Sequence, residues 1–130
     1  MIGLDTNVLV RYLMQDDARQ SAQATTLMES LSGEQPGFVS LTALIELVWV
    51  LSSAYAHKRA EVATVLDTLL RTAALRIERS ELAWRALKLF GSGSADFADC
   101  LIAISCSANG CTRTMTFDRG AARAGMTLIG

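Results

Sequence analysis

Five carboxylates lie inside or at the ends of strongly apolar segments of this chain: Asp5, Glu46, Asp96, Asp99 and Asp118. Removing an ionised carboxylate from water costs several kcal/mol unless a partner compensates its charge. No Lys or Arg occurs inside the apolar runs beside these acids. A cation that the sequence does not encode is therefore the expected partner. Oxygen ligands without His or Cys suit Mg²⁺ or Mn²⁺, which favours a metal-dependent chemistry on phosphate groups.

The composition predicts one packed domain, residues 1–130, because 51% of the residues are apolar and only 19% are charged. The net charge of −1 provides no general attraction to nucleic acid. A protein that handles RNA or DNA with this composition needs a local basic patch.

The chain is expected to be soluble and cytoplasmic. Its first residues, Met-Ile-Gly-Leu-Asp, carry no basic leader, so they do not resemble a signal peptide. No apolar run reaches the roughly 20 residues of a membrane span. The three cysteines are odd in number and form no C-x-x-C pair, which is typical of free thiols in a reducing compartment.

Apolar periodicity and turn residues predict alternating strands and helices. The strands are expected at residues 2–5, 38–40, 75–77, 112–117 and 126–129. The helices are expected at residues 6–13, from a cap at Asp16-Asp17 to about 31, from a cap at Ser40 or Thr42 to about 55, over 62–70 after a polar break at 57–59, at 80–90 and at about 96–108, with a short one near 121. Ser80 is the expected N-cap of the fifth helix. Alternation of this kind predicts an α/β fold in which helices cover both faces of a mainly parallel sheet of about five strands.

This topology brings the acids to one edge of the sheet, because ligands of open α/β sheets bind at the carboxyl ends of the strands. Asp5 and Asp118 each end a strand. The helix at 96–108 must run antiparallel to the strand that follows it, so its N-terminus, with Asp96 and Asp99, comes to the same edge. Glu46 lies in the second turn of the helix that leaves the second strand.

Each acid also has a purely structural interpretation. Asp5 could cap a helix, Asp96 and Asp99 could be an N-cap and its third-position partner, and Asp118 could be an ordinary turn acid. Glu46 could reach solvent, although its apolar neighbours argue against an exposed face at this position. The convergence of four segments favours the metal site.

The segments Leu4-Asp5-Thr6-Asn7-Val8-Leu9, Asp96-Phe97-Ala98-Asp99 and Thr116-Phe117-Asp118-Arg119, with the helical Glu46, resemble those of the PIN-domain nucleases. More narrowly, they resemble the VapC ribonuclease toxins of bacterial toxin–antitoxin pairs. The resemblance implies a three-layer α/β/α sandwich, an acidic pocket that binds Mg²⁺ or Mn²⁺, and RNA cleavage. It also implies that the family's four acids correspond to Asp5, Glu46, Asp99 and Asp118, and that Asp96 corresponds to an extra acid that is frequent in the family. Its supporting polar positions correspond to Thr6, Asn7 and Thr116.

We assign Asp5 and Asp99 as the principal metal ligands. Asp118 completes a metal site or binds through water, and Glu46 is a ligand or the general base; a one-ion and a two-ion mechanism both remain open. Substrate binding is expected from the arginines that border the pocket: Arg11, Arg113, Arg119 and Arg123.

The resemblance also implies a cognate antitoxin, a homodimer of this chain, and contact with DNA only through the antitoxin. Structured RNA such as tRNA is the expected substrate, because unstacked bases can enter a concave site.

One alternative is a PIN-like binding module without catalysis. A receiver-type signalling domain is the other, but it needs paired acids after the first strand and a late Lys, whereas Asp5 stands alone and no Lys follows Lys88.

Overall fold

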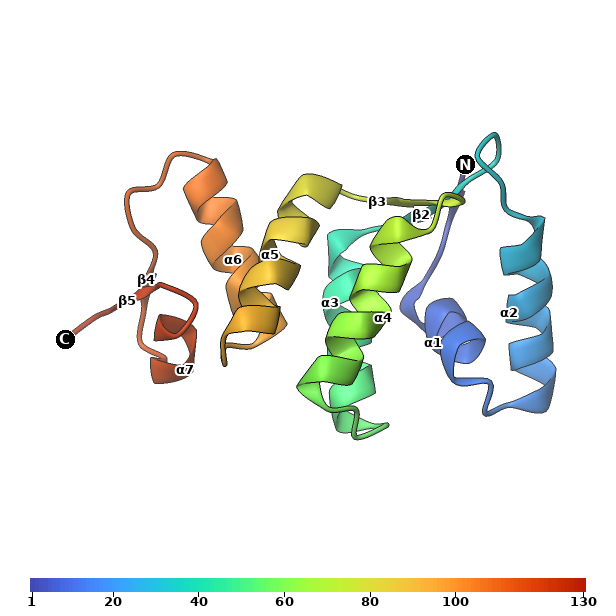
Figure 1. Cartoon of the computed structure of the whole chain (residues 1–130), viewed down its shortest axis with the longest axis horizontal. Helices are drawn as coiled ribbons and strands as arrows, with labels where there is room; N and C mark the ends of the chain where they lie inside the picture. Colours follow the sequence, from blue (N-terminus) through green and yellow to red (C-terminus); the bar gives the residue numbers. More distant parts are fainter. The chain divides into compact units, whose positions relative to one another are not determined.

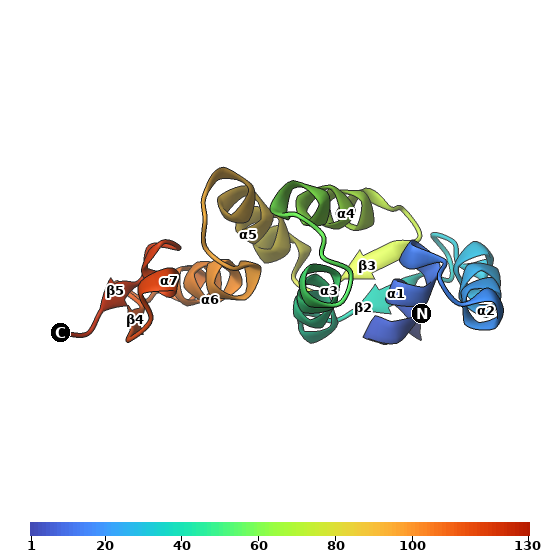
Figure 2. The same ribbon diagram turned by 90° about the horizontal axis from the view of Figure 1, so that it is seen from below.

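The computed structural model describes residues 1–130, which divide into two compact units, Met1–Glu78 and Arg79–Gly130. Figures 1 and 2 show the ribbon of the chain with its elements labelled. The first unit contains three strands and four helices, in the order β1 (Ile2–Gly3), α1 (Thr6–Met14), α2 (Ala18–Ser30), β2 (Gly37–Val39), α3 (Leu41–Ser53), α4 (Arg59–Arg71) and β3 (Leu75–Ile77). The second unit contains α5 (Ser80–Ser92), α6 (Phe97–Ala108), β4 (Met115–Thr116), α7 (Arg119–Ala122) and β5 (Thr127–Leu128).

The first unit is built on a three-stranded parallel sheet in which β2 lies between β1 and β3. Helix α1 packs on both α2 and α3, and α4 packs on α3 and β3. Three leucines on one side of α3 are fully buried and form the centre of the core: Leu44, Leu47 and Leu51. Their spacing of three and four residues is that of one helix face, so the core fixes how α3 is rotated about its axis.

The second unit is held together by the packing of α5 on α6. Phe97, which is 1% exposed, meets Phe90 edge to face, with ring centroids 5.9 Å apart. Strands β4 and β5 pair in parallel, and α7 packs against both. Phe97 thus anchors the first turn of α6, the turn that carries Asp99.

The α/β fold class is confirmed, but the strands are shorter than predicted and form a three-stranded and a two-stranded sheet. The predicted strand at 2–5 ends at Gly3 because Asp5 is already the N-cap of α1. Of the predicted strand at 112–117, only Met115 and Thr116 pair, and they pair with β5. Apolar character alone does not provide a partner for each backbone group, so it overestimates strand length.

The prediction that Ser80 caps α5 was wrong. The N-cap is Arg79, in a left-handed backbone conformation with φ 45°. Its carbonyl accepts the first helical hydrogen bonds, from the backbone N–H groups of Leu82 and Ala83, so Ser80 is already inside the helix. None of the helices combines the length and apolar character that a membrane crossing requires.

Candidate functional site

Each unit gathers one group of the predicted acids, and we describe the two groups separately. In the first unit, Asp5 and Glu46 line a cavity of about 350 Å³. Its wall also includes four other polar residues, namely Thr6, Asn7, Arg11 and Tyr55. We call this cavity the acidic pocket. Five of the residues predicted from the sequence to form or border the site thus lie around one opening, although they come from α1 with its N-cap and from the middle of α3.

Local hydrogen bonds position both acids of the acidic pocket. The Oδ1 atom of Asp5 accepts a hydrogen bond of 2.8 Å from the backbone N–H of Thr6. The hydroxyl of Thr6, which is buried, donates to Oε2 of Glu46 at 3.5 Å. Asp5 is therefore a helix cap as well as a candidate ligand, because only one of its carboxylate oxygens takes part in capping.

The expectation that Glu46 avoids an exposed face was wrong. Glu46 is exposed, and Trp49 on the same helix is 70% exposed. The buried leucines occupy one side of α3, so the positions between them turn the acid and the indole outward. Sequence hydrophobicity could not predict this, because nearly every residue around Glu46 is apolar.

The acids of the second unit influence one another electrostatically. Burial raises the pKa of Asp99, and the negative charges of Asp96 and Asp118 raise that pKa further. Asp99 is half-buried, whereas Asp96 and Asp118 are exposed. The carboxylate of Asp99 therefore lies in an environment that already carries negative charge, where a cation would relieve the repulsion.

Asp96 and Asp118 both precede helices, but they use their side chains differently. Asp96 is the N-cap residue of α6, yet its carboxylate accepts no capping hydrogen bond. Asp118 caps α7, since its Oδ1 accepts from the N–H of Gly120 at 2.8 Å. Thr116 supports this turn, because its hydroxyl accepts from the N–H of Asp118 at 3.0 Å. The interpretation of Asp96 as a mere helix cap therefore loses its main support.

The premise that all five carboxylates are withdrawn from water was wrong for four of them. Asp5, Glu46, Asp96 and Asp118 are exposed, so only Asp99 carries a desolvation cost. No Lys or Arg forms an ion pair with any of the five. In neither unit do three or more His, Cys, Asp or Glu side chains stand close enough together to hold a metal ion. The atoms that each group offers to a metal ion are nonetheless all oxygens, which are the ligands that Mg²⁺ and Mn²⁺ prefer.

The four predicted substrate-binding arginines occupy different surroundings. Arg11 lines the acidic pocket, and Arg119 begins α7 directly after Asp118. Arg123 is exposed at the C-cap of the same helix. Arg113 lines another cavity of the second unit, which contains none of the acids. Within the two units, Arg11 and Arg119 are therefore the arginines closest in structure or sequence to an acid group.

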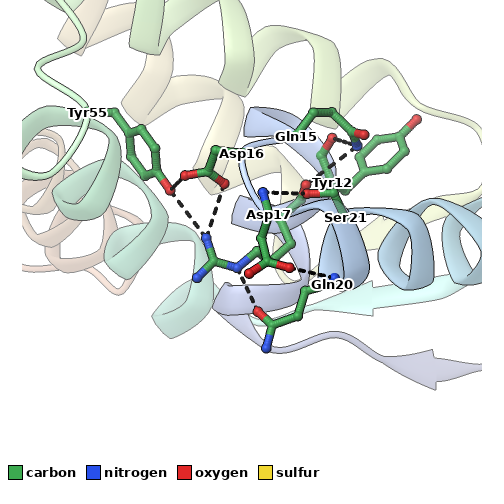
Figure 3. A network of polar contacts seen from close by, with 8 residues as sticks. Tyr12, Gln15, Asp16, Asp17, Gln20, Ser21 and Tyr55 are labelled. Carbon is green, nitrogen blue, oxygen red and sulfur yellow. Dashed lines mark hydrogen bonds and ion pairs between the residues drawn. The ribbon is translucent and has the colours of Figure 1, made fainter.

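Sequence reasoning missed the three residues that hold Arg11 in place, Asp16, Gln20 and Tyr55. Arg11 pairs with Asp16 at 3.1 Å, and the hydroxyl of Tyr55 donates to Asp16 at 2.6 Å (Figure 3). Tyr55 lies 39 residues after Asp16, so no local pattern could have connected them. The Asp16-Asp17 pair was visible in the sequence only as a helix start, which Asp17 fulfils by capping α2.

Comparison with known proteins identifies the family. The sequence model of the PIN domain matches residues 2–125, which span both units. The chain belongs to the PIN domain family. It is also 26% identical over 116 residues to a VapC ribonuclease of Aquifex aeolicus (strain VF5), covering 89% of this chain and 86% of that protein. No solved structure matches the chain significantly. The PIN match excludes the receiver-type alternative.

Proposed function

We propose that this PIN-domain chain is a metal-dependent endoribonuclease, the toxin of a toxin–antitoxin pair, and that residues 1–130 act as one functional domain. The observation that carries the proposal is the similarity, over 89% of the chain, to a protein named VapC ribonuclease. The PIN-domain match to residues 2–125 supports it, because it includes all five acids. The absence of an ion pair on any of these acids supports a role for them in binding a cation.

The proposed roles follow from the position and chemistry of each acid. Asp5, Asp99 and Asp118 are the metal ligands, with Asp96 as an additional acid whose carboxylate is not used for capping. A bound Mg²⁺ would neutralise charge on the phosphodiester oxygens and lower the pKa of an attacking water. Glu46 serves as a ligand or as the general base. Thr6 orients it, and its hydroxyl contact at 3.5 Å leaves one carboxylate oxygen of Glu46 available.

The proposed substrate is RNA with an unstacked, accessible loop, such as a tRNA. A net charge of −1 provides little general affinity for nucleic acid, so binding relies on the cation and on a few local arginines. Arg11, Arg113, Arg119 and Arg123 are the candidates, and each would contact phosphate rather than bases. A single-stranded loop is favoured over a duplex because its bases can turn into a concave site.

The proposed partners are a second copy of the chain and a cognate antitoxin, in the cytoplasm. The tail of the antitoxin would cover the acidic site and place a basic side chain where the cation binds, because an acidic cleft attracts positive charge. Contact with DNA would occur only through the antitoxin. A copurified small protein that leaves cleavage unchanged would contradict this part of the proposal.

The decisive experiment is cleavage of total RNA by the purified chain with Mg²⁺, with Mn²⁺ and with a chelator. Cleavage should require the metal and disappear in Asp5→Asn and in Asp99→Asn, both checked for folding by circular dichroism. Glu34→Gln is the matched control, because Glu34 is an exposed turn acid without an ion pair. Wild-type activity in either folded Asn variant would refute the metal site. RNA binding without cleavage in the native protein would instead indicate a non-catalytic PIN module.

A further inference from the structure

A second cavity of the first unit adjoins the acidic pocket along α1. This cavity has a volume of about 530 Å³ and lies between α1 and α2, where its wall includes Asn7, Val8, Arg11, Gln20, Gln23 and Leu27. We call it the amide pocket. Asn7 and Arg11 line both cavities, so anything bound in the amide pocket lies next to the acids. Its volume is within the range of pockets that bind small organic ligands, about 300–1,000 Å³.

The amide pocket offers hydrogen-bonding groups that no other part of the protein uses. The side-chain amides of Asn7 and Gln23 are exposed and make no hydrogen bond within the chain. Each amide presents a donor and an acceptor side by side, the pattern that pairs with the edge of a nucleobase. Val8 and Leu27 supply apolar surface in the same cavity, against which the flat face of a base can lie.

Arg11 is held firmly at the junction of the two cavities. Its Nε donates to Oε1 of Gln20 at 2.8 Å, and its Nη1 donates to Asp16 at 3.1 Å and to the Tyr55 hydroxyl at 3.4 Å. Figure 3 shows Asp16, Gln20 and Tyr55 converging on this guanidinium from three segments of the chain. The Nη2 group has no partner among these contacts, so two N–H donors remain for an anion.

The contacts of Arg11 fix the orientation of its guanidinium but add little to the stability of the fold. The Arg11–Asp16 pair is partly exposed, with side chains 33% and 41% accessible, and such pairs contribute little to stability. A planar guanidinium fixed by three partners is nevertheless pre-organised to bind phosphate in one geometry. Asp16 and Tyr55 are positioning residues in this arrangement, because they act only through Arg11.

We propose that the amide pocket binds one unstacked nucleotide of the RNA beside the cleaved bond, with its base on Asn7 and Gln23 and its phosphate on Arg11. This inference rests on the proposed ribonuclease function. It adds a base-reading subsite, since phosphate contacts position a nucleic acid whereas contacts to base edges select its sequence. The nucleotide adjoining the cleaved phosphodiester is then selected by the first unit alone.

Binding is tested without catalysis, so that its outcome is independent of nuclease activity. Metal-free ¹⁵N-labelled protein is titrated with millimolar adenosine, guanosine, cytidine and uridine 5′-monophosphates, and separately with ribose 5-phosphate and inorganic phosphate. The side-chain amide resonances of Asn7 and Gln23 should shift with at least one nucleotide and much less with ribose 5-phosphate. Equal shifts with inorganic phosphate, or no shift with any nucleotide, would overturn the proposal even if the protein cleaves RNA.

Kinetics then connects the subsite with cleavage. Gln23→Ala should raise KM for RNA about five- to tenfold, with kcat nearly unchanged, and should relax the base preference at one position beside the cut. Glu29→Ala is the control on the same helix, because Glu29 is exposed and lies outside the pocket. Unchanged base preference in both Gln23→Ala and Asn7→Ala would overturn the assignment.

Two further variants separate positioning from charge. Tyr55→Phe removes one of the groups that hold Arg11 and should raise KM without changing which base is preferred. Arg11→Lys keeps the charge but not the planar fork, so its KM should resemble that of Arg11→Ala. Full function of Arg11→Lys would show that orientation of the guanidinium is irrelevant. If the native protein cleaves no RNA, the ribonuclease proposal fails, and the titration still decides whether the amide pocket binds nucleotides.

Discussion

Gly37 begins the central strand of the first unit and leaves no room for a side chain. It pairs with Ile2 of β1 and Leu75 of β3. A Cβ atom on this residue would lie 2.8 Å from Leu31 Cδ1, 2.8 Å from Leu4 Cδ1 and 3.1 Å from Leu75 Cδ2. Carbon atoms normally approach to about 3.5–4.0 Å, so Gly37→Ala must displace three buried leucines.

The expected loss of stability combines two opposing effects. Overpacking a core costs about 1–3 kcal/mol, and the leucine methyl groups can move to relieve part of it. Replacing Gly by Ala also restricts the unfolded chain, which stabilises the folded state by about 0.4–1 kcal/mol. The midpoints of these two ranges leave a net loss of about 1.3 kcal/mol, or a fall in Tm of roughly 5 °C for a chain of this size.

Thermal unfolding followed by circular dichroism, with urea unfolding as a second measurement, tests this expectation. Gly33→Ala is the matched control, because an added Cβ there meets no atom within 4 Å; only the effect on the unfolded chain remains, which should stabilise the protein by about 0.4–1 kcal/mol. Leu4 immediately precedes Asp5, so Gly37→Ala should also lower RNA cleavage below its Tm, whereas Gly33→Ala should not. Equal stability of the two variants would refute the close packing around Gly37.

Three other predictions concern the acids, the core of the second unit and the pH dependence. Asp99→Asn should reduce metal-dependent cleavage by about a hundredfold or more, yet raise the Tm measured in chelator, since it removes repulsion from neighbouring acids; a lower metal-free Tm would contradict this. Phe97→Ala should destabilise the protein by about 3–5 kcal/mol, because the ring is 1% exposed, and a change below about 1 kcal/mol in urea unfolding would argue against that burial. The hydrogen bond from Tyr55 lowers the pKa of Asp16, and the nearby Arg11 lowers it further. The stability that this lowered pKa contributes is present above the ordinary Asp pKa and is lost as the pH falls through the lower folded-state pKa of Asp16. Tyr55→Phe should therefore show a smaller drop in Tm between pH 7 and acid conditions than the wild type. An identical drop would exclude the hydrogen bond between Tyr55 and Asp16.

Much of the local structure could be predicted because its causes are local. Helix starts follow from residues such as Asp17 and Ser40, whose side chains cap the helices that follow them. The third strand, residues 75–77, has the bounds that its apolar pattern predicts. Strand ends at β1 and β4 were misjudged, because strand pairing depends on a partner elsewhere in the chain. The arrival of Asp5 and Glu46 at one cavity followed from the general rule for the carboxyl edge of parallel strands.

The sequence by itself determined the order of helices and strands, the position of Asp5, Asp96 and Asp118 at element boundaries, and the family to which the chain belongs. Those features depend on neighbouring residues and on motifs that can be read along the chain. Only the tertiary structure decided that Glu46 faces outward, that Asp16 and Tyr55 hold Arg11, and that Asn7 lies between two cavities. These features require side chains up to 44 residues apart to meet, and no local pattern specifies that meeting because it depends on how the helices pack over the sheet.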